Sequence, residues 1–229
     1  MERSDITDMV DSIRKDCIFS EFCNQTCSPV CMRYIEFNYL LKTSNIPLVK
    51  QRVNRLTPDS CDVLAFEMLA KIRDNILNFV DSGRNLYIYS NVCGNGKTTW
   101  AIKLMLQYFN EVWAGNAFTK RGLFVNTPTF LSMCKSTISH PDKDFSVLRE
   151  DLTKVDLLIF DDIASTKLSE YDYNTLLNYI DQRVLNEKST IYTGNVKPKD
   201  MHLYLGNRLT SRICNSNSMC IELKGRDMR

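Results

Sequence analysis

The sequence has no large excess of either charge and no long apolar run. Its 29 Lys and Arg stand against 27 Asp and Glu, a formal net charge of +2. Such a balance creates no global field for a polyanion, so any contact with nucleic acid must be local. No apolar stretch is long enough to span a bilayer, and residues 1–5 are too polar for a signal peptide. We therefore expect a soluble cytoplasmic protein without membrane contact.

Internal repeats, low-complexity tracts and a disulfide framework are also missing. The nine cysteines are an odd number. Five of them are scattered among segments that we predict to be core or loop: Cys61, Cys93, Cys134, Cys214 and Cys220. This distribution favours reduced thiols.

The chain of 229 residues can bury one full core and a small appendage. Residues 1–42 are rich in cysteine, polar residues and aromatics without a long period, which indicates a separate small module. Residues 43–60 contain Pro47 and Pro58 in loop-like sequence and are the predicted linker. Residues 61–229 then form the predicted main domain.

Strand and helix patterns alternate along the main domain. One amphipathic helix over 62–80 leads into an apolar strand at 86–89. Further helices are predicted at 98–113, 130–134, 171–185 and 206–213, and further strands at 122–126, 155–160, 190–193 and 219–223. Apolar strands separated by helices favour an α/β fold, with a five-stranded parallel sheet flanked by helices on both faces.

A glycine-rich turn follows the first strand and opens a helix. Gly94-Asn95-Gly96-Lys97-Thr98 matches the end of the phosphate-loop pattern, whose backbone amides and helix N-terminus bind phosphate. Lys97 would reach the β/γ-phosphates, and Thr98 would ligate Mg²⁺. Asn91 stands where the pattern has its first glycine, and asparagine tolerates left-handed φ. The predicted nucleotide-binding residues are Asn91, Cys93, Gly94, Asn95, Gly96, Lys97, Thr98 and Thr99.

Polar side chains also follow two later strands. Asp161 and Asp162 end the strand over 155–160, where Asp161 is placed to hold the Mg²⁺ and Asp162 is the candidate general base for water. Asn195 follows the strand over 190–193 and could bind the γ-phosphate or the attacking water. A strand and a helix intervene between Lys97 and Asp161, which predicts an extra strand between the two motif strands. That arrangement is typical of ATPases that couple hydrolysis to motion, and no guanine-reading Asn-Lys pair is present.

Arg208 and Arg212 lie four residues apart, on one face of the predicted helix over 206–213. An arginine offered to the γ-phosphate of a neighbouring subunit would stabilise charge in the transition state. The alternative for these residues is a solvated basic helix face.

Four motifs together resemble the DnaC/DnaI-type replicative helicase loaders, which are AAA+ P-loop ATPases with similar phage-encoded versions. They are residues 94–98, 158–163, 193–195 and 208–212. The resemblance covers residues 45–229. It implies that Lys97 and Thr98 act as Walker A, Asp161 and Asp162 as Walker B, Asn195 as sensor 1, and Arg212 as the arginine finger with Arg208 nearby.

The resemblance also implies an ATP- and Mg²⁺-dependent oligomer that binds a replicative ring helicase and places it on single-stranded DNA during replication. A phage-encoded member would work in the bacterial host cytoplasm. The chain departs from fuller AAA+ proteins by ending without a C-terminal helical lid. Arg226 and Arg229 resemble the short arginine-bearing end of the family, without an assigned role. Candidate DNA contacts are Lys120, Arg121 and Lys135, with Phe130 either a stacking platform or a core residue.

Four cysteines cluster near the N-terminus: Cys17, Cys23, Cys27 and Cys31. Four thiolates within fifteen residues suit a tetrahedral Zn²⁺ site, although the usual C-x2-C spacing is missing. An iron–sulfur cluster and unliganded thiols are the alternatives. Because the loaders often carry a cysteine-rich N-terminal module, we predict that residues 1–42 contact the helicase.

Three other functions share parts of this pattern. An IstB-type transposition helper ATPase has nearly the same motifs but acts with a transposase. A small-molecule phosphotransferase would need an arginine-rich lid and an acceptor pocket, and neither is visible. A non-enzymatic ATP-binding adaptor stays open because Asp162 is shorter than the glutamate that many hydrolases place there.

Overall fold

A computed structural model describes residues 3–17, 23, 27–28, 30–51 and 56–227. Five parallel strands form one sheet in the order β2-β3-β4-β1-β5. The strands are β1 (Asn85–Tyr89), β2 (Gly122–Asn126), β3 (Leu157–Ile163), β4 (Ser189–Gly194) and β5 (Ser218–Glu222). The predicted five-stranded parallel sheet is thus confirmed. A strand does lie between β1 and β3, but it is β4; the strand that intervenes in the sequence, β2, lies at the edge of the sheet.

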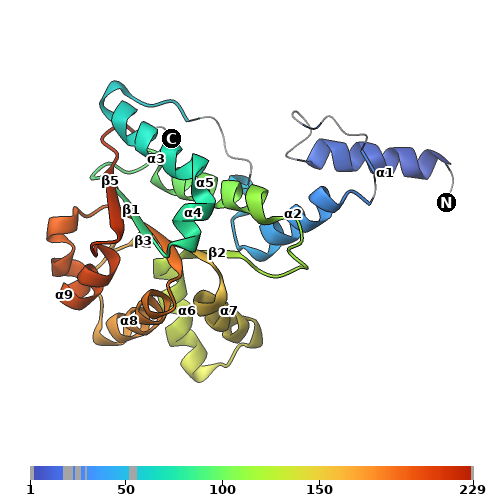
Figure 1. The fold of residues 1–229 in the computed structure, drawn as a ribbon. Helices are drawn as coiled ribbons and strands as arrows, with labels where there is room; N and C mark the ends of the chain where they lie inside the picture. The colour runs from blue at the N-terminus through green and yellow to red at the C-terminus, as the bar shows by residue number, and fades with distance from the viewer. Residues whose placement is uncertain (1–2, 18–22, 24–26, 29, 52–55, 228–229) are drawn as a thin grey trace.

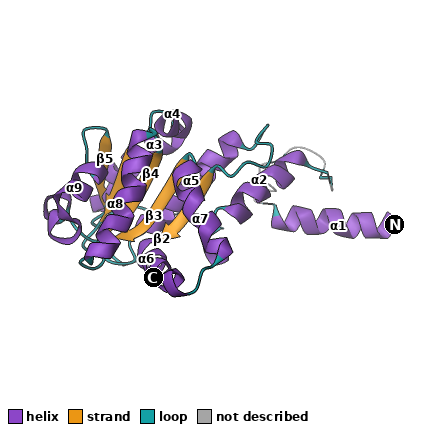
Figure 2. Ribbon diagram, turned by 90° about the horizontal axis from the view of Figure 1, so that it is seen from below, coloured by secondary structure: helices purple, strands orange, loops and turns teal. Residues whose placement is uncertain are grey.

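Helices cover both faces of the sheet (Figures 1 and 2). One hydrophobic cluster joins the sheet to helices α3 (Val63–Asp74), α4 (Ile76–Asp81) and α5 (Lys97–Val112). The other joins it to α6 (Thr127–Ser139), α7 (Lys143–Lys154), α8 (Glu170–Leu185) and α9 (His202–Ile213). Because both faces are covered, the central strands β1, β3 and β4 are buried along nearly their whole length, on both faces.

Three helices differ from the sequence prediction. The helix predicted over 62–80 is broken into α3 and α4 at Asn75, whose φ of −123° and ψ of 33° are not helical. The short helix predicted at 130–134 is the middle of the longer α6, which Asn126 caps by accepting a hydrogen bond from the Thr129 amide. Helix α7 was not predicted, because only its narrow apolar face, with Phe145 and Leu152 buried, signals it.

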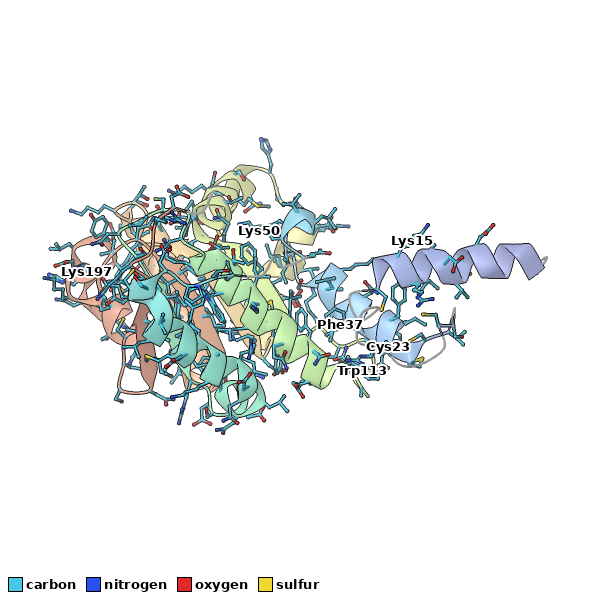
Figure 3. The ribbon with its side chains drawn as sticks, turned by 90° about the horizontal axis from the view of Figure 1, so that it is seen from above. Lys15, Cys23, Phe37, Lys50, Trp113 and Lys197 are labelled. Carbon is cyan, nitrogen blue, oxygen red and sulfur yellow. The ribbon has the colours of Figure 1, made fainter. Side chains whose placement is uncertain are left out.

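The N-terminal part divides into two helices. Helix α1 (Arg3–Asp16) projects away from the body (Figures 1 and 2). Helix α2 (Met32–Thr43) instead buries Phe37, Leu40 and Leu41 in the same hydrophobic cluster as α5. The amide of Phe124 on β2 donates to the carbonyl of Ser44 at 2.7 Å. Residues 32–46, which the sequence assigned to the module and the linker, therefore pack on the main domain, and Phe37 and Trp113 lie at this junction (Figure 3).

Among the described residues, no helix is long and apolar enough to cross a membrane.

A buried arginine holds the amino ends of β3 and β4. Arg183 on α8 is 1% exposed, and it donates hydrogen bonds to five acceptors. They are the carbonyls of Leu152, Val155, Asp156 and Ser189 and the hydroxyl of Thr190. Burial lowers the pKa of Arg183 to about 10, so the guanidinium stays charged at neutral pH. The side chain ties α7, α8, β3 and β4 together.

We expect Arg183→Met to lower the free energy of unfolding by about 3 kcal/mol or more, because it removes the donor from five acceptors, four of them buried. Urea denaturation measures this change. The control is Arg73→Met, since Arg73 pairs with the adjacent, exposed Asp74, and its loss should change the free energy by about 0.5 kcal/mol or less. Similar losses in both variants would contradict the role given to Arg183.

Candidate nucleotide-binding site

The loop between β1 and α5 takes its shape from two glycines and one buried asparagine. Gly94 and Gly96 have φ of 73° and 96°, values that other residues adopt at a cost. Asn91 does not adopt positive φ, so the loop closes without a glycine at that position. Asn95 is 1% exposed, and its side-chain amide donates to Ser90 Oγ at 2.6 Å and to the Leu223 carbonyl at 3.1 Å. The side-chain hydrogen bonds of Asn95 therefore hold the loop in place.

Lys97 and Thr98 begin helix α5 directly after this loop. Lys97 Nζ donates to the Val92 carbonyl at 2.8 Å and to Asn95 Oδ1 at 3.3 Å, which keeps the ammonium over the loop. The free amides at the helix N-terminus add positive potential at the same place. The loop and the helix start form a site with the chemistry that binds phosphate.

Asp161 accepts hydrogen bonds from two threonine hydroxyls. Thr98 Oγ1 and Thr193 Oγ1 each donate to Asp161 Oδ1 at 2.7 Å. The residue is only 6% exposed. These contacts bring together the start of α5 and the carboxyl ends of β3 and β4. Thr98 and Asp161 supply oxygen atoms side by side, which is the donor type that Mg²⁺ requires.

A β-bulge lets Asp162 reach the same site as Asp161. Successive side chains of a strand normally point to opposite faces, but the register of β3 against β4 shifts between Phe160 and Ile163. Asp162 has a φ of 60°, and its amide donates to Thr193 Oγ1 at 3.0 Å. Burial raises the pKa of the Asp162 carboxyl, the neighbouring Asp161 raises it further, and Lys97 opposes the shift.

These residues line one cavity of about 430 Å³ at the carboxyl edge of the sheet. Of the predicted site residues, it is lined by Cys93, Gly94, Gly96, Lys97, Thr98, Thr99, Asp161, Asp162 and Asn195. Asn91 is exposed outside the cavity, and Asn95 is buried behind the loop. The buried Asn195 Oδ1 has no hydrogen-bond partner within the described part of the chain. An orphaned polar atom, a lysine and an oxygen pair fit a nucleoside triphosphate with Mg²⁺.

Three further residues line this cavity and were not among the predicted site residues: Lys50, Asn126 and Thr193. Thr193 belongs to the 193–195 motif but had no assigned role, and its hydroxyl links Asp161 to the Asp162 amide. Asn126 ends β2, and a polar strand end was a signal that could have identified it. Lys50 comes from the short helix η1 (Leu48–Lys50), well before the glycine-rich loop (Figure 3). No local motif signals Lys50, because only the fold brings it to the cavity.

Arg208 and Arg212 lie outside the cavity, on the surface of α9. Both bind Asp181 of α8: Arg208 Nη2 and Arg212 Nε each lie 2.7 Å from a different carboxylate oxygen. Helix α9 contains a kink at Gly206, with φ of 73°, just before this pair. The two guanidinium groups are therefore held together and remain partly exposed.

The predicted DNA-contacting cations form ion pairs within the domain. Lys120 pairs with Asp151, Arg121 with Asp156, and Lys135 with Asp172. Phe130 is 2% exposed and packs among Phe145, Phe160 and Tyr179, so it is a core residue and no stacking platform.

Cys17, Cys23, Cys27 and Cys31 line a common cavity of about 250 Å³ between α1 and α2. Nevertheless, no three His, Cys, Asp or Glu side chains of the described residues are arranged to hold a metal ion. The geometry does not support the predicted zinc site.

Arg226 does not line the nucleotide cavity. The amide of Arg226 donates to Asp59 Oδ2 at 2.9 Å. Arg229 lies outside the described residues.

We expect Lys97→Met to weaken binding of Mg·ATP at least about tenfold, because a charge-assisted contact to phosphate is lost. Isothermal titration calorimetry measures the affinity. The control is Lys199→Met, because Lys199 is exposed and does not line the cavity. Unchanged affinity in Lys97→Met would mean that the nucleotide does not bind here.

No profile of a known protein family matches the chain. Among curated proteins, the replicative helicase loader DnaC of Escherichia coli (strain K12) is 26% identical over 153 residues. The match covers 67% of this chain and 59% of that protein, so the chain spans less than two thirds of this relative.

Several solved structures have a similar fold. The crystal structure of the DnaC helicase loader superimposes with a TM-score of 0.63 at 21% identity, over 76% of this chain and 97% of that one. The crystal structure of DnaI gives 0.61 at 17% identity, over 79% and 96%. AMPPCP-bound DnaA from Aquifex aeolicus gives 0.56 at 19% identity, over 74% and 48%. The predicted resemblance is thereby confirmed: the chain is similar in sequence to the helicase loader DnaC, and its α/β fold is similar to those of DnaC and DnaI.

Proposed function

We propose that the chain is an ATP-dependent helicase loader, which binds a replicative ring helicase and places it on single-stranded DNA. The observation that carries this proposal is the convergence of Lys97, Thr98 and Asp161 on one cavity, in a chain similar to DnaC. An IstB-type transposition helper is the alternative, and its partner would be a transposase.

The cavity residues have distinct roles in ATP hydrolysis. Bound Mg²⁺ would neutralise charge that develops on the phosphates. Lys97 and the loop amides bind the phosphate oxygens, and Thr98 and Asp161 are the residues that would hold the metal. Asn195 positions the attacking water, and Asp162 accepts its proton. Because the pKa of Asp162 is raised, this carboxylate is a better proton acceptor than an unperturbed aspartate, provided that it is ionised.

The arginines of α9 act on the site of a neighbouring copy. They lie outside the chain's own cavity, and Asp181 holds both with their guanidinium groups partly exposed. A surface arginine of this kind completes a second subunit's site on assembly, and hydrolysis then depends on the oligomer. We assign this role to Arg212, with Arg208 beside it.

The helicase contact is assigned to the N-terminal part that precedes α2. Helix α1 projects from the body, whereas α2 belongs to the main core. For DNA, the support comes from the fold neighbour DnaA, one structure of which is bound to AMPPCP and single-stranded DNA. Zinc and an iron–sulfur cluster form no part of the proposal.

Mixing two inactive variants tests whether Arg212 acts between subunits. Arg212→Ala should lower ATP turnover on the order of a thousandfold while ATP still binds, and Lys97→Met should turn over no ATP. Mixed together, they should regain turnover well above the sum of the two, because each Lys97→Met subunit supplies Arg212 to an intact cavity.

The control mixture pairs Lys97→Met with Arg73→Ala, a half-exposed arginine of α3 outside the cavity, whose loss should leave turnover normal. If the first mixture regains nothing, Arg212 does not act in trans. If Lys97→Met alone turns over ATP normally, the proposed catalytic site is wrong.

Removal of residues 1–30 should abolish co-purification with a co-expressed replicative ring helicase and leave ATP affinity unchanged. The cut spares α2, because Phe37 and Leu40 are needed for the core. Lys97→Met, with its N-terminal part intact, is the control for the pull-down. Retention of the helicase by the truncated chain would overturn the assignment, and capture of a transposase instead would favour the IstB-type alternative.

A further inference from the structure

Two cysteines outside the nucleotide cavity lie sulfur to sulfur. Cys214 caps the C-terminus of α9, and Cys220 lies on the edge strand β5, opposite Tyr87 of β1. Their Sγ atoms are 3.6 Å apart and share a hydrogen bond. A disulfide needs a separation of about 2.05 Å, so the two sulfur atoms would have to approach each other by roughly 1.5 Å.

The turn that joins the two cysteines is held by its own hydrogen bonds. Asn215 Oδ1 accepts from the Asn217 amide at 2.8 Å and from Ser218 Oγ at 2.9 Å. The Asn215 amide donates to Ser218 Oγ at 3.1 Å, and the Cys214 amide donates to the Thr210 carbonyl at 2.9 Å. The two thiols are thus kept together by a helix end, a strand and an ordered turn.

The two thiols differ in reactivity. Cys220 is exposed and Cys214 is partly buried. The hydrogen-bond contact between the two sulfur atoms lowers the pKa of the Cys220 thiol, and the same contact, with burial, raises the pKa of Cys214. The thiolate is the form that attacks an oxidant. Cys220 is therefore the group that reacts first, and Cys214 is the thiol next to it.

We propose that Cys214 and Cys220 form a reversible dithiol oxidation site, with a peroxide as the oxidant. The Cys220 thiolate attacks a peroxide oxygen of H₂O₂, the O–O bond breaks, and Cys220 becomes a sulfenic acid as hydroxide leaves and takes a proton to form water. The Cys214 sulfur then attacks the Cys220 sulfur, displaces hydroxide and loses its proton, which gives a second water. Two thiols and one H₂O₂ yield one disulfide and two water molecules.

The disulfide would join the end of α9 to β5. The Arg212 carbonyl, two residues before Cys214, already accepts from the side-chain amides of Asn85 and Asn215. Oxidation would thus fix the end of the helix that carries Arg212. Neither cysteine lines the nucleotide cavity, so ATP affinity should not change. The site is independent of the proposed loader function.

Peptide mass spectrometry of the full chain tests the proposal. The protein is titrated with H₂O₂, free thiols are blocked, and trypsin releases residues 213–224, which contain both cysteines. At low peroxide concentration, we expect the two cysteines of this peptide to escape thiol blocking. The mass of the peptide should then be lower than that of the reduced, unblocked peptide by two hydrogen atoms. Dithiothreitol should restore both thiols. Oxidation of Met219 instead adds one oxygen and is distinguished by mass.

Single variants assign the steps. Cys214→Ser should leave Cys220 as a sulfenic acid that dimedone traps, whereas Cys220→Ser should leave Cys214 unreactive at the same dose. Cys61→Ser is the control, because Cys61 is exposed but has no sulfur partner among the described residues, and it should change nothing. The proposal fails if the disulfide peptide forms only at doses that also oxidise Cys61, or if dimedone labels Cys220 equally in the wild type and in Cys214→Ser.

Discussion

The hydrogen bonds of the Asp161 carboxylate connect helix α5 and strands β3 and β4 at the candidate site. One of its oxygens accepts from Thr98 on α5 and from Thr193 on β4. These bonds require that β4 lie between β1 and β3, as the sheet order has it. A buried carboxylate is costly unless hydrogen bonds or a cation compensate for its lost hydration. The two hydroxyls supply part of that compensation, and Mg²⁺ would supply the rest.

The amino and carboxyl ends of β3 and β4 differ in how their polar groups are satisfied. At the amino ends of β3 and β4, the Arg183 side chain donates five hydrogen bonds to nearby acceptors. At the carboxyl ends, Asp162 has a left-handed φ beside a bulge, and Asn195 Oδ1 is buried without a partner among the described residues. A satisfied network stabilises one fold, whereas an unsatisfied one marks a place where a ligand fits. The hydrogen-bonded amino ends of β3 and β4 therefore support the ligand-binding residues at their carboxyl ends.

Sequence reasoning worked where local chemistry determines structure. The apolar strands and the glycine-rich loop were predictable, because burial on both faces and positive φ each demand particular residue types. Contacts between distant segments were not. Lys50 reaches the cavity from η1, α2 joins the core of the main domain, and Asp181 binds both Arg208 and Arg212. Each of these contacts depends on tertiary packing between distant segments. The hydrophobic periodicity of a single sequence does not reveal such packing.

The central claim is that Thr98 and Asp161 together hold the metal of a bound triphosphate. A crystal structure of the chain with AMPPCP and Mn²⁺ in place of Mg²⁺, with anomalous diffraction data, tests it most directly. The account predicts one anomalous peak within coordination distance of Thr98 Oγ1, beside Asp161 and the β/γ-phosphates, with Lys97 Nζ bound to the same phosphates. A metal peak on other residues, or a nucleotide bound away from the loop that contains Gly94 and Gly96, would contradict it.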